Sequence, residues 1–325
     1  MGRKSNSIVL MFCLWAFTGL GQKTLIPGAA QFSAYLPALK GKQVALVVNH
    51  TSVVGKTHLA NTLLSLGVSV KKIFAPEHGF RGTADAGAHI DNEVDRKTGL
   101  ALISLYGKHK KPTPEDLQGI DVVLFDIQDV GARFYTYSST LHYVLEACAE
   151  NKVPLTVLDR PNPNGHYVDG PVLEKAQASF VGLNPIPVVH GCTLGELARM
   201  INGEGWLVNR AKASLNVIPV ANYTHASPVH VAIAPSPNLP NDQSIALYPS
   251  LCLFEGTNVS IGRGTDLQFQ VAGPNIAGLG DYTFTPVPKP GAMDPPLKDQ
   301  KCYGYNLSNL RARNLGFSLK YLLYF

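Results

Sequence analysis

Four polar clusters follow short apolar runs in this sequence, and they hold most of its candidate catalytic side chains. They are PEHGFRG at 76–82, DIQDVGARFYTY at 126–137, DRPNPN at 159–164 and PSPNLPN at 235–241. Each combines charged or amide side chains with Pro and Gly, which restrict or define the backbone of a loop and so hold its side chains in place. Ligands of open α/β sheets bind outside the carboxyl ends of the strands, so the clusters predict one polar site.

Glu77 is the first candidate for acid–base chemistry. It stands between Pro76 and Gly79, with His78 and Arg81 close by in the sequence. A carboxyl group fixed in this way can donate or accept a proton at a defined point, as general acid–base catalysis requires. The structural alternative is an ordinary ion pair between Glu77 and Arg81 across a turn.

Two further carboxylates, Asp126 and Asp129, could add acid–base or hydroxyl-binding groups. Capping of neighbouring backbone N–H groups is their structural alternative. The tyrosines of this cluster alternate as in a strand, and they suit sugar binding or core packing equally. For Arg160, the structural alternative is an ion pair with Asp159. The candidate binding side chains of these loops are Gln128, Arg133, Tyr137, Arg160, Asn162 and Asn164.

Familiar cofactor motifs are incomplete or missing. The segment 54–57 (VGKT) resembles the end of a phosphate-binding loop, but His50 occupies the position of its first Gly, which argues against a nucleotide-binding protein. No G-x-G-x-x-G follows the first apolar run, and no H-E-x-x-H or G-x-S-x-G occurs. The basic residues are scattered and the net charge is only +5. We therefore expect no cofactor, no metal and no nucleic-acid partner.

The elements that position these residues alternate between two periodicities. Short apolar runs predict strands at 43–49, 70–75, 121–127, 154–158, 215–220 and 229–234. Helical spacing predicts helices at 57–66 and 139–151, and a third that begins after Thr193, where Glu196 completes a capping box. Strands that alternate with helices predict an α/β fold, with a mostly parallel sheet and helices on both faces.

The N-terminal residues 1–21 have the three parts of a secretory signal. Arg3 and Lys4 precede an apolar run at 8–17, and small residues follow at 18–21. This pattern predicts an exported protein, periplasmic or secreted, and no later segment predicts stable membrane insertion. The chain has 325 residues, which allows about two domains. Charged residues make up 16% and hydrophobic residues 45%, which excludes an intrinsically disordered protein.

From about Lys42 onward the sequence resembles the exo-β-N-acetylmuramidases, a family formerly described only as a domain of unknown function. The resemblance rests on FAPEHGFRG (74–82), TGLALISLYG (98–107), DIQDVGARFYTYSST (126–140), LDRPNPNG (158–165), PIPVVHGCTLGELA (185–198), PSPNLP (235–240) and EGTNVSIGRGT (255–265). It implies an enzyme that releases terminal N-acetylmuramic acid from the non-reducing end of peptidoglycan fragments, in cell-wall turnover and recycling. It also implies a Rossmann-like domain, a smaller C-terminal domain and an active site between them.

The resemblance assigns the catalytic role to the glutamate of the PEHG motif, which is Glu77. Asp126, Asp129 or Glu255 could supply the second carboxyl group of a glycosidase, and the acetamido group of the substrate offers another route. The lactyl carboxylate of muramic acid calls for cationic partners in the site. The candidates for binding the muropeptide or disaccharide substrate are His78, Arg81, Arg133, Arg160, His190, Asn238 and Glu255.

Among the departures from the family pattern, two put the activity in question. Ile261 stands where an acidic residue is expected, and Gln270 ends a segment that replaces a Pro-Phe-Glu sequence. These departures favour a non-catalytic muropeptide-binding protein as the alternative function. We predict a Rossmann-like catalytic domain at 24–270 and the start of a smaller α+β domain at 271–325. Because the resembling family continues beyond Phe325, we expect this domain to be truncated and the chain less stable than a longer relative.

Overall fold

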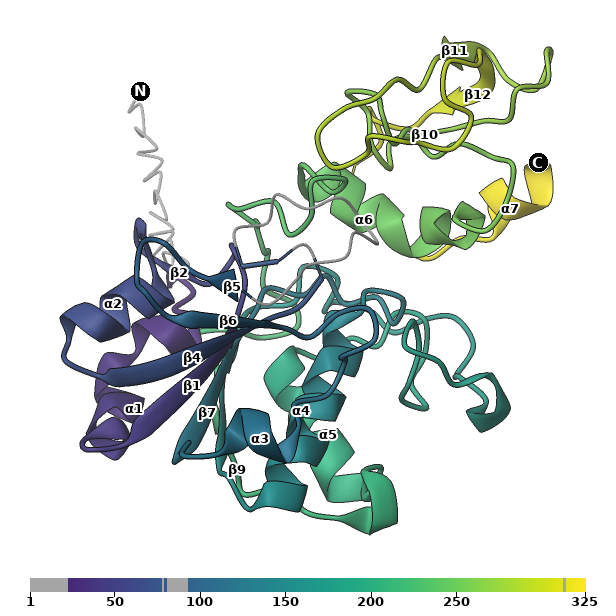
Figure 1. The fold of residues 1–325 in the computed structure, drawn as a ribbon. Helices are drawn as coiled ribbons and strands as arrows, with labels where there is room; N and C mark the ends of the chain where they lie inside the picture. Colours follow the sequence, from purple (N-terminus) through teal and green to yellow (C-terminus); the bar gives the residue numbers. More distant parts are fainter. Residues whose placement is uncertain (1–22, 78, 81–92, 312–313) are drawn as a thin grey trace, which may run out of the picture.

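The computed structural model describes residues 23–77, 79–80, 93–311 and 314–325 (Figure 1). The predicted signal peptide at 1–21 and the predicted site residues His78 and Arg81 lie outside these ranges. Among the described residues, no helix combines the length and the apolar character that crossing a membrane requires.

A seven-stranded sheet forms the larger part of the molecule. Its spatial order is β5 (Glu93–Val94), β6 (Ala101–Ser104), β4 (Ser69–Ala75), β1 (Gln43–Val48), β7 (Val122–Asp126), β8 (Leu155–Leu158) and β9 (Leu215–Ile218). Strands β6 to β9 in this order pair in parallel, and only the short edge strand β5 is antiparallel. This arrangement confirms the predicted α/β fold with a mostly parallel sheet.

Helices cover both faces of this sheet, as Figure 1 shows. On one side lie α1 (Phe32–Leu39) and α2 (Leu59–Ser65), and on the other α3 (Pro114–Leu117), α4 (Tyr137–Asn151) and α5 (Leu194–Glu204). Alternation along β1 divides its side chains between two hydrophobic clusters. Leu46 packs in the cluster that holds residues of α1 and α2, whereas Val47 packs in the one that holds residues of α4 and α5.

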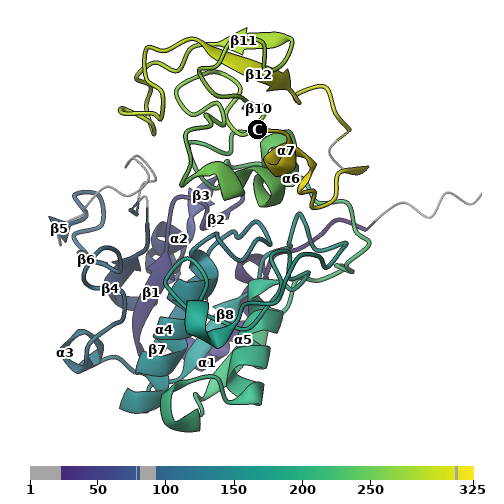
Figure 2. The same ribbon diagram turned by 90° about the vertical axis from the view of Figure 1, so that its right-hand side faces the viewer.

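A smaller region follows in the chain, with its own antiparallel sheet. It contains α6 (Asp242–Leu251), the strands β10 (Val271–Ala272), β11 (Tyr282–Phe284) and β12 (Cys302–Asn306), and α7 (Lys320–Tyr324). The strands pair in the order β10-β12-β11. In Figure 2 they lie at the top, with α6 and α7 between them and the parallel sheet.

Two local expectations have different outcomes. The capping box at the start of α5 is present, because the Thr193 side chain accepts from the Glu196 N–H and the Glu196 carboxylate accepts from the Thr193 N–H. The predicted strand at 229–234 is wrong, because this segment is irregular. Its backbone forms hydrogen bonds with side chains rather than with a neighbouring strand. The Val231 N–H donates to Asp242, and the Ala234 carbonyl contacts His50.

Candidate active site

A pocket lies at the carboxyl edge of the parallel sheet, where the smaller region meets it. The chain after β4, β6 and β7 forms one part of its wall, and α6 and the segments around it form the other. Its described lining residues are Glu77, Tyr106, Phe134, Tyr135, Thr136, Phe180, Val181, Ser236, Asn238, Leu239, Tyr248, Glu255, Arg263 and Phe269. The structure therefore brings together residues that are far apart in the sequence.

Glu77 is held in this pocket by two hydroxyl groups. It follows directly on strand β4, in a turn closed by the hydrogen bond from the Gly79 N–H to the Pro76 carbonyl. The Thr136 hydroxyl donates to Glu77 Oε2 over 2.9 Å, and the Tyr106 hydroxyl also bonds to this carboxylate. Burial and the charge of Glu77 raise the pKa of Tyr106 to about 12, so Tyr106 remains a donor at neutral pH.

Glu255 is the second carboxylate of the pocket. It lies at the end of a short 3₁₀ helix (Cys252–Phe254) and forms an ion pair with Arg263, whose guanidinium also lies 5.6 Å from the ring centre of Phe269. Burial raises the pKa of Glu255, Arg263 opposes this rise, and the negative charge of Glu77 adds to it. The negative charge of Glu77 therefore acts on Glu255 across one pocket.

Asp126 and Arg160 do not line this pocket. Asp126 is fully buried at the end of β7, and its carboxylate binds the Arg160 guanidinium in two places, Nε–Oδ1 at 2.5 Å and Nη2–Oδ2 at 3.0 Å. The carboxylate of Asp159 accepts instead from the Thr193 hydroxyl and the Gly195 N–H. Asp126 and Arg160 thus form a buried ion pair that ties the end of β7 to the loop after β8.

Asp129 and His190 are also buried outside the pocket lining. Oδ2 of Asp129 accepts from the Gly131 N–H over 2.7 Å and lies 3.9 Å from His190 Nε2. Within the described part of the chain, neither ring nitrogen of His190 has a hydrogen-bond partner. Burial raises the pKa of Asp129 to about 7 and lowers that of His190 to about 4. Both groups are therefore expected to be mostly neutral near pH 6.

We expect Asp129→Asn to change how stability depends on pH. The wild-type carboxyl stays protonated in the folded protein up to about pH 7 but ionises near pH 4 when unfolded. Its contribution to stability is therefore complete below pH 4 and is lost as the pH rises through 7. Between pH 4 and pH 7, the free energy of unfolding of Asp129→Asn should therefore rise relative to that of the wild type by about 1.4 kcal/mol per pH unit. Urea unfolding of both proteins at pH 5, 6, 7 and 8 measures this difference, and a constant difference would contradict it.

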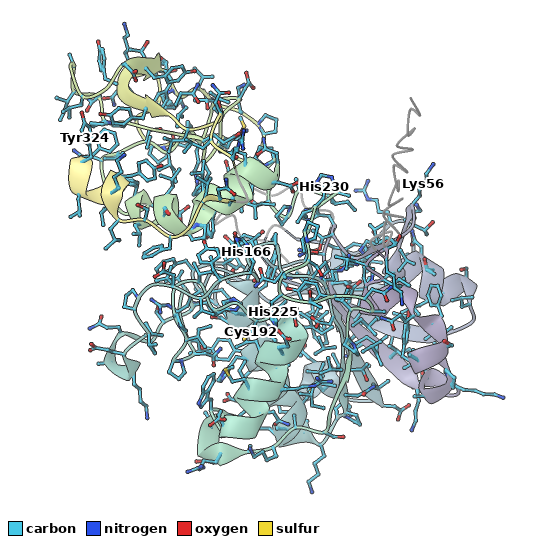
Figure 3. All side chains as sticks on the ribbon, turned by 180° about the vertical axis from the view of Figure 1, so that it is seen from behind. Lys56, His166, Cys192, His225, His230 and Tyr324 are labelled. Carbon is cyan, nitrogen blue, oxygen red and sulfur yellow. The ribbon has the colours of Figure 1, made fainter. Side chains whose placement is uncertain are left out.

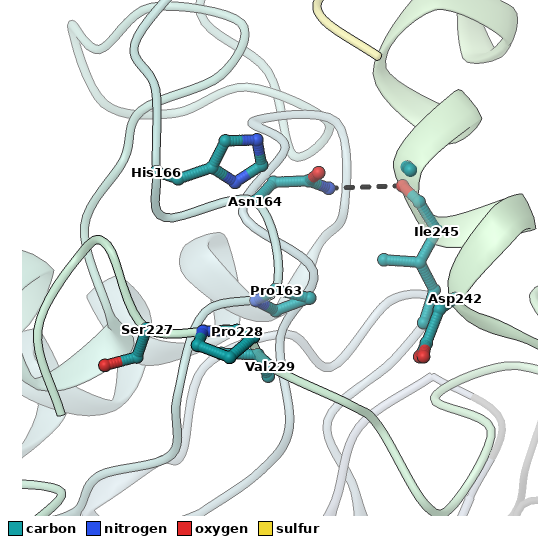
Figure 4. A pocket seen from close by; sticks show the side chains of 9 residues that line it. Pro163, Asn164, His166, Ser227, Pro228, Val229, Asp242 and Ile245 are labelled. Atoms are coloured by element: carbon teal, nitrogen blue, oxygen red, sulfur yellow. Dashed lines mark hydrogen bonds between the residues drawn. The ribbon is translucent and has the colours of Figure 1, made fainter. Parts of the chain in front are cut away.

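Four other predicted binding residues use their side chains on backbone carbonyl groups. Gln128 and Arg133 each donate to two carbonyl oxygens, over 2.6–2.8 Å. Asn162 donates to one carbonyl over 2.9 Å. Asn164 donates to two, and its bond to the Ile245 carbonyl links the loop to α6 beside a second hollow (Figure 4). The structure places these four side chains in the loop framework rather than in the pocket with Glu77.

The remaining predicted residues divide between the pocket wall and its support. Tyr137 begins α4, and its hydroxyl accepts from Asn49 Nδ2 over 2.9 Å. Its ring packs edge-on against Tyr135, with ring centres 4.8 Å apart, and Tyr135 itself lines the pocket. Asn238 also lines the pocket, while its Nδ2 donates to a backbone carbonyl over 2.9 Å.

Sequence reasoning missed several pocket residues. Tyr106 and Thr136 hold the carboxylate of Glu77, and Arg263 pairs with Glu255. Tyr106 and Arg263 stand inside the SLYG and IGRGT strings that carry the family resemblance. The strand before Tyr106, β6, is not predicted from the sequence, so the sequence does not indicate that its carboxyl end belongs to the site.

The histidines do not form a metal site in the described part of the chain, where no group of three or more His, Cys, Asp or Glu side chains is suitably placed. Figure 3 shows His225 next to Cys192 at one end of α5, and His230 away from both. His225 Nε2 lies 3.1 Å from Glu196, and His230 Nδ1 lies 2.6 Å from Asp242.

Two family models match the greater part of the chain. The model of the exo-β-N-acetylmuramidase NamZ N-terminal region matches residues 44–243, and the model of the NamZ C-terminal region matches residues 246–320. Peptidoglycan β-N-acetylmuramidase NamZ of Bacillus subtilis is 44% identical over 262 residues, which are 78% of this chain and 60% of the relative. The chain thus spans about 60% of the length of this curated relative.

Solved structures show the same fold. Crystal structures of two DUF1343 family proteins from Bacteroides fragilis match this chain. One is 48% identical, with a TM-score of 0.86 over 93% of this chain and 82% of that protein. The other is 30% identical, with a TM-score of 0.80 over 92% of this chain and 81% of that protein. Together with the two family models, these matches show that the chain belongs to the exo-β-N-acetylmuramidase NamZ family.

Proposed function

We propose that this chain is a glycoside hydrolase that releases terminal β-1,4-linked N-acetylmuramic acid from the non-reducing end of peptidoglycan fragments. The observation that carries this proposal is the pairing of Glu77 and Glu255 in one pocket, in a chain of this family. Glycosidases commonly use two carboxyl groups that flank the scissile bond. Export, as predicted from residues 1–21, would bring the enzyme to such fragments during cell-wall turnover and recycling.

In the proposed reaction Glu77 acts as the general acid. Its carboxyl group donates a proton to the glycosidic oxygen as the bond from C1 to that oxygen breaks. A water molecule supplies the hydroxyl group at C1, and its other proton replaces the one that Glu77 has given up. Thr136 and Tyr106 orient the carboxyl group from two sides. Glu255 supplies the second carboxyl group, and its pairing with Arg263 fixes its position.

The burial of the pocket lining supports cleavage at a chain end. Tyr248, Asn238 and Ser236 are buried, whereas Val181 is 55% exposed. The pocket lining therefore combines buried residues with exposed ones. A terminal sugar that packs against the buried residues would have little room for a further sugar on that side, as an exo-acting glycosidase requires.

A non-catalytic muropeptide-binding protein is the alternative function, suggested by the departures at Ile261 and Gln270. Both side chains are buried, and neither lines the pocket. Ile261 belongs to the main hydrophobic cluster, and the Gln270 side chain accepts a hydrogen bond from Asn241. The two substitutions leave Glu77 and Glu255 in place, which favours catalysis over binding alone.

The direct test is incubation of the purified chain with the disaccharide N-acetylmuramyl-β-1,4-N-acetylglucosamine. We expect release of free N-acetylmuramic acid, detected by mass spectrometry, in proportion to time and protein. Calorimetric binding of the disaccharide without any release would instead support the non-catalytic alternative.

Arg263 is expected to select the muramyl group. It is the only positively charged side chain among the described lining residues, and the lactyl carboxylate distinguishes muramic acid from glucosamine. A hydrogen bond between charged groups contributes about 1.5–3 kcal/mol, so Arg263→Met should weaken N-acetylmuramic acid binding by about 10- to 100-fold. Binding of the derivative with a lactyl carboxamide should change much less. Calorimetry with both sugars measures the effect of Arg263→Met on binding, with Glu255→Gln as the matched variant. If the binding of both sugars is weakened equally, Arg263 does not select the muramyl group.

A further inference from the structure

The segment 171–186 forms a loop that contributes to the pocket lining and whose two ends lie close together. Arg133 holds its two ends together, because Nη1 donates to the Pro171 carbonyl over 2.8 Å and to the Ile186 carbonyl over 2.6 Å. The Leu173 N–H adds a third bond at this base, to Ile186 over 3.2 Å. Arg133 is buried, so its charge is committed to this closure. The sequence suggests Arg133 for substrate binding, whereas the structure shows its side chain at this closure and outside the pocket lining.

The tip of the same segment contributes Phe180 and Val181 to the pocket lining. A tight turn presents them, with paired backbone bonds between Ser179 and Gly182 at 2.9 and 3.1 Å. Phe180 is half-buried and Val181 is exposed, so apolar surface remains in contact with solvent at the pocket entrance. Exposed apolar groups at the mouth of a polar pocket are typical of a ligand contact.

Phe180 is firmly supported on the protein side. Its ring stacks nearly parallel to Tyr143, with centres 6.2 Å apart, and packs edge-on against Tyr106 at 6.3 Å. Lys110 Nζ lies 4.7 Å from its ring centre. Tyr106 in turn bonds to Glu77, so only one side chain separates Phe180 from the proposed proton donor.

We propose that the tip of segment 171–186 is the subsite for the leaving sugar, with Phe180 as its main contact and Arg133 as the residue that positions it. This inference rests on the proposed function. If the terminal muramyl group contacts the buried lining residues Tyr248 and Asn238, the exposed Val181 and its neighbour Phe180 remain for the sugar across the scissile bond. The apolar face of a pyranose ring suits such a surface, and no cation or carboxylate is needed for it.

Two substrates with the same muramyl group separate this subsite from the rest of the pocket. The disaccharide N-acetylmuramyl-β-1,4-N-acetylglucosamine carries a leaving sugar, whereas N-acetyl-β-muramyl fluoride has only fluoride as its leaving group. We expect Phe180→Ala to lower kcat/KM for the disaccharide by about 5- to 10-fold, as loss of some 40–60 Å² of apolar contact implies. The same variant should cleave the fluoride at a rate within twofold of that of the wild type. Phe180→Trp should keep most of the disaccharide activity, and Tyr303→Ala, on β12, is the control.

Arg133→Gln tests the positioning role with the same pair of substrates. Loosening the base of the segment should lower disaccharide turnover severalfold and spare the fluoride, whereas a merely structural role would reduce both rates and the melting temperature together.

If Phe180→Ala loses activity equally on both substrates, or on neither, the subsite is overturned. The activity of the wild type would still leave the proposed function standing. A wild type that cleaves neither substrate would overturn both.

Discussion

Glu77→Gln is expected to lower kcat/KM for N-acetylmuramyl-β-1,4-N-acetylglucosamine by about 10²- to 10⁴-fold, the range that a positioned general acid contributes. Glutamine keeps the shape of the side chain and can still accept from Thr136, whose hydroxyl donates to Glu77 Oε2 over 2.9 Å. The change removes the transferable proton and the negative charge of the ionised carboxyl group. Because the leaving sugar is a poor leaving group without protonation, the loss should appear mainly in kcat.

The dependence on the leaving group makes this expectation specific. A 4-nitrophenyl muramide releases a stable phenolate and needs little protonation, so Glu77→Gln should reduce its turnover far less than that of the disaccharide. Glu204→Gln, near the end of α5 and outside the pocket lining, serves as the matched control. Equal losses on both substrates would assign Glu77 a role other than general acid, such as nucleophile. A loss below tenfold on the disaccharide would remove Glu77 from the chemistry.

The parallel sheet could be predicted because its strands are buried on both faces. β1, β7 and β8 are continuous apolar runs, and each lies within two residues of its predicted bounds. β6 was missed because ALIS is short and has one β-branched residue. The apolar residues of 229–234 suggested a strand, yet β9 is the edge of the sheet and this segment pairs with no strand. The pairing of a strand depends on which segments lie beside it in the fold, and local sequence patterns do not report this.

The candidate site was only partly predictable for a related physical reason. The carboxyl ends of parallel strands collect polar side chains for two purposes, binding a ligand and satisfying the backbone of long loops. Glu77 serves the first purpose in our proposal, whereas Gln128 and Asn164 bond to backbone carbonyls. The local sequence around a polar residue does not show which of the two purposes its side chain serves. Glu255 and Arg263 reach the pocket only through the packing of the smaller region, so their contact with each other and with the Glu77 site required the structure.

Asp126 and Arg160 form a buried ion pair between the end of β7 and the loop after β8, and removal of either charge is expected to cost about 3–5 kcal/mol of folding stability. The Asp126 side chain is 0% exposed and that of Arg160 only 10%, so each variant leaves the opposite charge buried without its partner. Asp126→Asn and Arg160→Met should therefore both lower the midpoint of urea unfolding at pH 7. Glu150→Gln, which breaks a partly exposed pair with Lys111, should change stability by less than about 1 kcal/mol.

The double variant Asp126→Asn/Arg160→Met separates pairing from burial. Removing both charges leaves no uncompensated ion, so its stability loss should be clearly smaller than the sum of the single losses, with a coupling of at least about 2 kcal/mol. Since neither residue lines the pocket with Glu77, the folded single variants should retain disaccharide turnover within severalfold of the wild type. Large losses of kcat with unchanged unfolding midpoints would instead return Asp126 and Arg160 to the catalytic site. That outcome would mean that the ion pair opens when substrate binds.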